Sequence, residues 1–423
     1  MKHTSRTIAL RSILSALVFL SLVMTLAACG ESANANGKIQ LKLWYWNRSI
    51  DDDLIAAVNK QFPNIELRAE KITDYDNKVR TSMAGHYGVP DIMGINDNIA
   101  TYFPAEDQFV DLRTLGADEV KSQYLEWKWN LGVTPDGKMI GFPMDTGPTA
   151  LFYRADLFEK AGLPSDPAAV AAQFKTWDDY LQAAVKYKEA MNGKSFMIDN
   201  ASTVYGQILA QSVKRYFTTS NQYIGNDDHI KQMWNEATKA AQEGVTAKIQ
   251  NWTPAWNQAA NNGQIASFVG ASWMKQVLQE AAPDTAGKWR ITYAPGGAGN
   301  SGGSFLGITK YSQHPKEAFE VIKWLQSSAN QVTGYKALQL YPSAISALDD
   351  PGLHQKEAFY GGQDTTTIFS DVAKRVPLTY HGPDEGLVGT PVTDQLSLVE
   401  FQNKNPNQAW NDAQQTAQRE LLR

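Results

Sequence analysis

The chain has 423 residues, of which 43% are hydrophobic and 11% aromatic, with 12 Trp, one Cys and six His that lie far apart. This length suits two domains or one large one with a sizeable core. The formal net charge of −5 argues against a nucleic acid or another polyanion as the main partner. No short ligand spacing typical of a metal site is present, and we expect neither a metal nor a cofactor.

The N-terminal segment is typical of an export signal. Three basic residues precede an uncharged, mostly apolar run, which is shorter than the roughly 20 residues of a membrane span. The small residues before Cys29 match a bacterial lipobox, and the alternative is an ordinary leader that ends near a Cys. We expect a lipoprotein signal peptide over 1–28 and a flexible tether over 29–38. The mature chain, with a net charge of −8 after the loss of three basic residues, would be lipid-anchored at the extracytoplasmic face of the cell membrane.

From residue 39 onward the pattern predicts a β-α-β-α-β unit. We expect strands over 39–46, 65–69 and 90–95, with helices that begin near Asp51 and Asp74. This order implies a parallel sheet with right-handed crossovers. Ligands bind beyond the carboxyl ends of the strands in such sheets.

That rule places two short polar segments on one rim of the sheet. Trp46, Asn47 and Arg48 follow the first strand, and Asn96 and Asp97 follow the third. Trp46 either stacks on a ligand or lies in the core, and Arg48 either donates to a hydroxyl or forms a surface ion pair. Asn96 and Asp97 either bind hydroxyls or cap a helix.

The rest of the chain alternates further helices and strands. Helix is expected in much of 177–244, after Thr176, and in a polar amphipathic segment at the C-terminus. Strands are expected at 265–269, 290–294 and 305–309, with a Gly-rich loop at 295–304. A helix is expected to begin at Pro315, and the C-terminal helix is expected over 407–422.

Several motifs in fixed order resemble one family. The sequence GKMIGFP-MDTGP over 137–148, followed by ALFYRADLF over 150–158, is similar to the hallmark of the extracellular solute-binding proteins of ABC importers, family 1. Within that family it resembles the sugar-binding group that includes maltose-binding protein. Supporting matches run in the right order through essentially the whole mature chain: FPNI at 62–65, PDI at 90–92, TWDD at 176–179, GQIA at 263–266 and the block 303–325.

The resemblance implies an α/β fold of two lobes, each a mostly parallel sheet flanked by helices, with the ligand bound between them and a hinge crossed several times by the chain. The first crossing is expected near 144–148. The implied division is 39–144 (first lobe), 145–295 (second lobe), 296–313 (return to the first lobe) and 314–423 (mainly the second lobe and the C-terminal helices).

The resemblance also implies site residues. Trp273, after a Gly-ended strand, is expected to stack on a sugar, and Tyr380 lies where the family often returns an aromatic residue to the site. Asp145 at the crossing either binds a hydroxyl or stabilises the hinge. Asn200, after a predicted strand end over 196–198, and Gly303 are further candidate site residues. Asn200 is alternatively an ordinary loop residue. The chain lacks the acids that maltose-binding protein has near Asn200 and at Gly147, which puts maltodextrin specificity in doubt. We expect Trp252 and Trp256 in the core and His381 in a polar loop.

The function that follows is a monomeric, lipid-anchored receptor that captures a carbohydrate and delivers it to the transmembrane subunits of an ABC permease. Nothing in this role requires catalysis, and we expect no enzyme activity. The alternatives are an exported lipid-anchored carbohydrate-active enzyme, whose signature is a pair of opposed carboxylates, and a binding protein for a non-sugar ligand.

Overall fold

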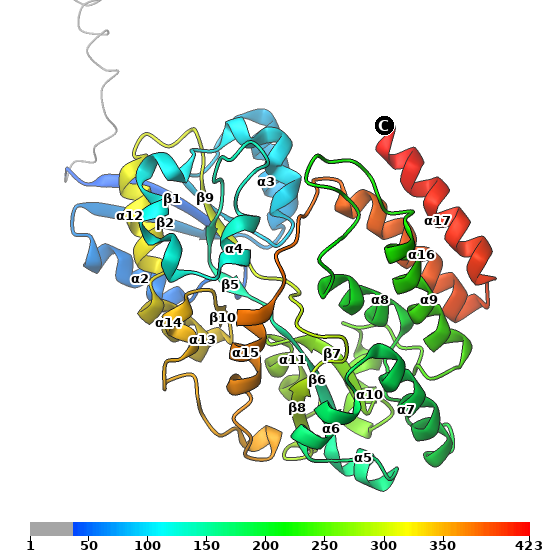
Figure 1. Ribbon diagram of the computed structural model, residues 1–423. Coiled ribbons are helices and arrows are strands. Elements are labelled where there is room, and N and C mark those ends of the chain that lie inside the picture. The colour runs from blue at the N-terminus through cyan, green and yellow to red at the C-terminus, as the bar shows by residue number, and fades with distance from the viewer. Residues whose placement is uncertain (1–36) are drawn as a thin grey trace, which may run out of the picture.

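The computed structural model describes residues 37–423; the predicted signal peptide, Cys29 and most of the predicted tether lie outside the described residues. The chain forms two lobes, each with its own sheet (Figure 1). None of the helices in residues 37–423 has the length and apolar character that crossing a membrane requires. In the first part of the chain the helices are α2 (Asp52–Gln61), α3 (Tyr75–Gly85), η1 (Ile99–Gln108), η2 (Leu112–Leu115), η3 (Ala117–Gln123), α4 (Glu126–Leu131), α5 (Ala155–Lys160), α6 (Pro167–Gln173), α7 (Trp177–Ala190), α8 (Ala201–Ala210) and α9 (Asp228–Gln242). They are followed by α10 (Pro254–Asn262), α11 (Met274–Ala281), η4 (Pro283–Thr285), α12 (Pro315–Leu325), α13 (Ser328–Leu338), α14 (Ile345–Leu348), η5 (Ala358–Tyr360), α15 (Thr366–Arg375), α16 (Glu385–Gln402) and α17 (Pro406–Leu421).

The first-lobe sheet has the strand order β2-β1-β3-β9-β4. β1 pairs in parallel with both β2 and β3, so the predicted β-α-β-α-β unit is confirmed. Asp51 caps α2 by accepting a hydrogen bond from the backbone N of Asp53, which satisfies one of the free amides of the first turn. The strands are β1 (Ile39–Tyr45), β2 (Ile65–Lys71), β3 (Ile92–Ile95), β4 (Phe142–Pro143) and β9 (Phe305–Ile308).

β9 returns to this sheet after the chain has built part of the second lobe. It lies between β3 and β4 and is antiparallel to both. Helix α12 then packs against α2 and β9, although it belongs to the segment 314–423 that we assigned mainly to the second lobe. The lobe boundaries remain a prediction; the contacts of α12 are with elements of the first lobe.

The second-lobe sheet differs from the expected mostly parallel one. Its strands are β7 (Ser267–Ala271), β6 (Thr149–Arg154) and β8 (Trp289–Tyr293), and β6 is antiparallel to both neighbours. Parallel pairing occurs only as isolated bridges beside β7, between Phe196 and Ile265 and between Ile198 and Thr246, among the described residues. The physical reason is that β6 enters the lobe from the hinge, whereas β7 and β8 both end at the hinge edge.

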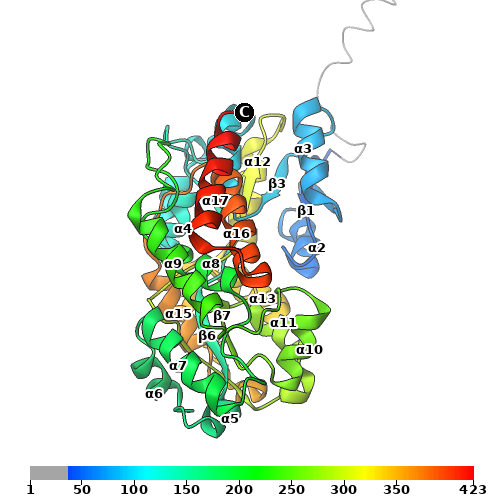
Figure 2. The same cartoon turned by 90° about the vertical axis from the view of Figure 1, so that its right-hand side faces the viewer.

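Helices cover this sheet where the sequence predicts them. Thr176 and Asp179 form a reciprocal capping box that begins α7. The C-terminal α17 buries an Ala-rich stripe around Trp410, which confirms the predicted amphipathic helix. Helices α16 and α17 pack on each other, and α16 also packs against α8 and α9 (Figures 1 and 2).

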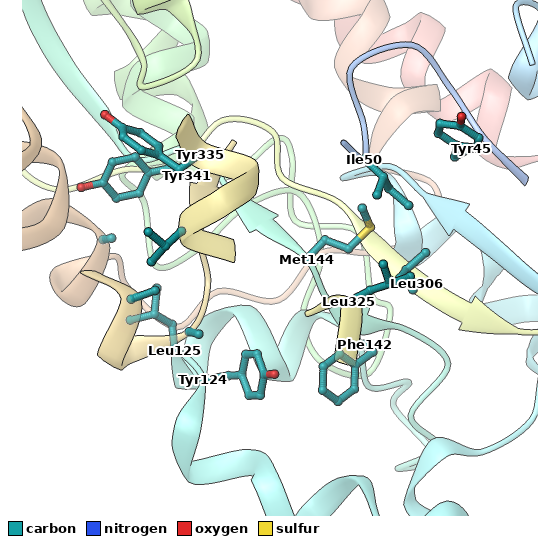
Figure 3. Packing of buried hydrophobic residues seen from close by; sticks show 14 of the residues in the cluster. Tyr45, Ile50, Tyr124, Leu125, Phe142, Met144, Leu306, Leu325, Tyr335 and Tyr341 are labelled. Atoms are coloured by element: carbon teal, nitrogen blue, oxygen red, sulfur yellow. The ribbon is translucent and has the colours of Figure 1, made fainter. Parts of the chain in front are cut away.

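The largest apolar cluster extends from the first-lobe sheet through the hinge into the second lobe. Figure 3 shows part of it, in which Met144 of the first crossing lies among first-lobe residues such as Leu306. Tyr341 packs edge-on against Tyr335, with ring centroids 5.6 Å apart. A continuous core at the hinge gives both lobes a common base from which the cleft opens.

Candidate functional site

The hinge is built from short extended segments that lie side by side. β5 (Asp145–Thr146) pairs in an antiparallel manner with β10 (Tyr341–Pro342). The backbone N of Gly147 donates to Oδ1 of Asn300, and the N of Ser301 donates to the O of Gly147, both at 2.8 Å. The crossing predicted near 144–148 is therefore held by two other segments that are distant in sequence.

Two glycines allow these segments to approach closely. A Cβ on Gly147 would lie 2.0 Å from the O of Ser301, and one on Gly303 would lie 2.6 Å from the O of Asp145. Gly303 also has φ of +95°, a conformation that residues with a side chain rarely adopt. The hinge therefore requires glycine at both positions.

Two cavities lie between the lobes and share Asp97 and the loop residues Ser301, Gly302 and Gly303. The tryptophan cavity, of about 450 Å³, contains Trp46 and Trp273. The tyrosine cavity, of about 460 Å³, contains Tyr205 and Tyr216. Eight of the ten predicted site residues line the tryptophan cavity: Trp46, Asn47, Arg48, Asn96, Asp97, Asp145, Trp273 and Gly303.

Strand ends bring these residues together. Trp46, Asn47 and Arg48 follow β1, Asn96 and Asp97 follow β3, and Trp273 follows β7 of the other lobe. This is the edge at which open α/β sheets bind ligands. The site therefore joins the carboxyl ends of strands from both lobes.

The two tryptophans are held by different contacts. Trp46 packs edge-on against Tyr75, with centroids 5.0 Å apart. Trp273 donates from Nε1 to the O of Ser301 at 3.0 Å, and Trp252 stacks on its ring at 5.0 Å. Trp252 is 59% exposed, so our assignment of it to the core is wrong, whereas Trp256 is buried as expected. Trp273 is therefore held by the stack on Trp252 and by the hydrogen bond to the hinge segment.

Two charged side chains of the tryptophan cavity, Asp145 and Arg48, already have partners. Asp145 accepts a hydrogen bond from the N of Ser304 at 2.8 Å. Arg48 hydrogen-bonds to Gln276 and lies 3.7 Å from a carboxylate oxygen of Glu280, both on α11 of the facing lobe. Arg48 therefore lines the cavity and also links the lobes.

Two expected site residues do not line either cavity. The side chain of Asn200 caps α8 by accepting from the N of Thr203 at 2.9 Å, and it donates to Ile249 and Asn251. Tyr380 donates from its hydroxyl to Asn221 at 3.0 Å and packs against the second-lobe core. Both side chains therefore make their contacts within the second lobe, and a role for them in ligand binding remains a prediction.

The tyrosine cavity contains groups that sequence reasoning missed. Arg215 forms a bidentate pair with Glu385, with Nε–O distances of 3.1 and 3.0 Å, across 170 residues of sequence. Lys128 and His381 also line the cavity; His381 lies in a loop, as predicted. The one local signal is that Lys128 stands between the buried Trp127 and Trp129.

Burial determines the electrostatics of the cleft. It raises the pKa of Asp97, against the opposing effect of Lys128 and Arg215, and it raises the pKa of Asp145 in the same way. Burial lowers the pKa of His381 well below its usual value, and the charges of Arg215 and Lys128 add to this effect. The charged lining residues balance in number: Arg48, Lys128 and Arg215 against Asp97, Asp145 and Glu385.

Comparison with known proteins was made against this geometry. The family model described as bacterial extracellular solute-binding protein matches residues 53–360. The arabinooligosaccharide-binding protein of Bacillus subtilis (strain 168) is 23% identical, covering 94% of this chain and 96% of that protein. The lactose-binding protein of Rhizobium radiobacter is 24% identical, covering 90% of this chain and 96% of that protein.

Solved structures have the same two-lobed fold. A crystal structure of an extracellular solute-binding protein family 1 superposes with a TM-score of 0.87 at 30% identity, covering 90% of this chain and 99% of that one. The galacto-N-biose-/lacto-N-biose I-binding protein of Bifidobacterium longum, in complex with lacto-N-biose, superposes with a TM-score of 0.76 at 21% identity, covering 91% and 97%. The two-lobed architecture that the motifs imply is confirmed.

Proposed function

This chain belongs to the bacterial extracellular solute-binding proteins, and we propose that it binds a carbohydrate between its lobes and delivers it to the transmembrane subunits of an ABC permease. The observation that carries the proposal is a charge-balanced interlobe cleft in which Trp46 and Trp273 line one cavity. Aromatic rings pack against the apolar faces of a sugar while polar groups bond its hydroxyls. Two relatives are named as binding proteins for arabino-oligosaccharides and for lactose, and these names support the same ligand class.

The proposed ligand-binding residues are the eight that line the tryptophan cavity, named above. Equal numbers of positive and negative groups in the cleft favour an uncharged ligand, because a charged one would leave a desolvated charge unpaired. A saccharide satisfies this condition and offers many hydroxyls to carboxylate, amide and guanidinium groups.

The test is a thermal-shift panel of neutral mono- and oligosaccharides, with amino acids and short peptides as the non-sugar arm. A ligand at 100 times its Kd stabilises the folded state by about 2.7 kcal/mol, which is a clear rise in melting temperature. Calorimetric titration of each hit then gives its Kd. Stabilisation only by amino acids or peptides would overturn the carbohydrate assignment.

We propose binding without turnover. Asp97 and Asp145 line the same cavity, which is the kind of pair that the rival glycosidase would use. Asp145, however, accepts a hydrogen bond from the backbone of Ser304. A saccharide recovered intact after prolonged incubation with the protein supports the receptor, and its hydrolysis products would establish the enzyme.

We further propose that the protein acts as a monomer anchored by lipid on Cys29. Cys29→Ser leaves the folded lobes unchanged and releases the protein into soluble fractions, because the acylated sulfur is the anchor. Fractionation of cells that express each form, with ligand affinity as the control for folding, checks this. A cleaved variant that stays with the membrane would contradict lipid anchoring.

A further inference from the structure

Lys128 is a buried lysine that lines a cavity between the lobes. It lies on α4, its side chain is 1% exposed, and it still lines the tyrosine cavity. Its Nζ lies 3.5 Å from the centroid of the Phe305 ring. Within residues 37–423 no hydrogen bond or ion pair of the ammonium appears, so its three donors meet only the aromatic face and the cavity.

Lys275 provides the matched comparison. It is also 1% exposed, but its Nζ donates to the hydroxyl of Tyr335 at 3.0 Å and to a carboxylate oxygen of Glu357 at 2.8 Å. A buried ammonium is costly unless it is paired and hydrogen-bonded. Lys275 meets this condition within the protein, whereas Lys128 does not.

The ammonium of Lys128 lies close to a residue that the two cavities share. Gly303, which is shared by both cavities, approaches so closely that a Cβ there would lie 3.1 Å from the Nζ. The charges of Asp145 and Asp97 favour the ammonium form, but neither carboxylate forms an ion pair with it among the described residues. The ammonium is therefore charge-compensated at a distance and still has donors to offer.

We propose that Lys128 is a ligand-binding residue, whose ammonium donates hydrogen bonds to hydroxyl or ring oxygens of a neutral saccharide that reaches both cavities. This inference rests on the proposed function. Asp97 and Asp145 accept from hydroxyls of the same ligand, so the sugar meets donors and acceptors together. A bound oxygen gives the buried ammonium the partner that the described residues do not supply. Polar groups left without a partner inside a protein are typical of functional sites.

The pH profile of binding supplies an independent readout. Burial lowers the pKa of Lys128 to about 7, against the opposing charges of Asp145 and Asp97. The other titratable or charged groups that line this cavity are Arg215, His381, Glu385, Tyr205 and Tyr216; burial raises the pKa of both tyrosines, so they stay protonated over this pH range. Because only the ammonium form has all its donors, affinity is highest below pH 7 and falls as the pH rises through it.

The experiment compares Lys128→Met with Lys275→Met, using a neutral saccharide that stabilises the wild type in the panel. Calorimetry should show the Kd of the Lys128 variant rising on the order of 10- to 100-fold, without a lower melting temperature for the free protein. The Lys275 variant should melt earlier and bind normally, because its partners lie outside the two cavities.

Different failures are distinguishable. A wild type that binds no saccharide overturns the proposed function and this role with it, whereas wild-type affinity in the Lys128 variant overturns the role of Lys128 alone. If Lys128→Met does not fold, the wild-type Kd measured from pH 6 to pH 9 decides, and a flat profile overturns the inference. A preference for a uronic-acid oligosaccharide over its neutral counterpart overturns the neutral ligand class.

Discussion

At the scale of the residue, Trp273 both lines the tryptophan cavity and donates a hydrogen bond to the hinge segment, and two substitutions separate these contributions. Trp273→Ala removes a ring that lines the cavity and a hydrogen bond to the hinge, so sugar binding should weaken by about 1–3 kcal/mol. Trp273→Phe keeps the aromatic face and should lose less than about 1 kcal/mol. Calorimetric titration measures both values.

The control is the buried Trp256, whose replacement by Ala should cost about 3–5 kcal/mol of unfolding free energy with little direct effect on affinity. If Trp273→Ala instead binds like the wild type while its unfolding midpoint falls sharply, Trp273 is a structural residue and the site assignment in the second lobe is wrong.

Asp199 should contribute to the pH dependence of stability. Burial raises its pKa to about 7, against hydrogen bonds from Asn200, Thr203 and Trp256, compared with about 3.9 in an unfolded chain. Between these values the folded protein holds a proton that the unfolded chain has lost, so stability falls as the pH rises from about 4 to about 7. Asp199→Asn should flatten this decline in urea unfolding at a series of pH values. A decline that persists in the variant would assign it to the other carboxyl groups whose pKa burial raises, Glu400, Asp97 and Asp145.

At the scale of the element, Asn200 tests whether helix capping accounts for a residue that its place after a predicted strand end had suggested for ligand binding. Asn200→Ala should destabilise the protein by about 1–2 kcal/mol, because α8 loses its N-cap. The Kd for a saccharide should not change, since Asn200 lines neither cavity. Asn200→Asp keeps the capping oxygen and serves as the control in chemical denaturation. A selective loss of affinity in Asn200→Ala would restore the binding role.

The elements also explain which secondary structure could be predicted. The sequence predicted β1, β2, β3 and the helices between them. The local spacing of apolar residues shows which side of each element is buried. The direction of β6 relative to β7 and β8 was not predictable, since a fully buried strand has the same pattern in parallel and antiparallel sheets. The direction depends on where the chain enters the lobe.

At the scale of the whole molecule, Arg48 should affect the balance between open and closed forms. It joins the loop after β1 to Gln276 and Glu280 on α11, across the cavity. Arg48→Ala removes this link, so the ligand-free variant should have a larger radius of gyration than the wild type in small-angle scattering. The exposed pair is worth at most about 1 kcal/mol, so the shift is a change in populations.

Saturating saccharide should reduce the radius of gyration of both proteins, because hinge closure buries the ligand. Lys42→Ala, which breaks an ion pair with Glu70 within the first lobe, is the control and should not change the radius. Proven binding with an unchanged radius in every case would show that the site is rigid.

The sequence by itself determined the family, the two-lobed fold and eight of the residues that line the tryptophan cavity. Motif order identifies the family, and the ends of parallel strands meet at one edge, so Trp46 and Asp97 were assigned to a common rim from local order alone. The tertiary structure alone decided what faces that rim. Contacts between distant segments pair Arg215 with Glu385 and place the Lys128 ammonium at the tyrosine cavity. They also hold Asn200, the N-cap of α8, against Ile249 and Asn251. Local periodicity shows which side of an element is buried. The element that packs against that side is determined only by the tertiary fold, because it can come from any distance along the chain.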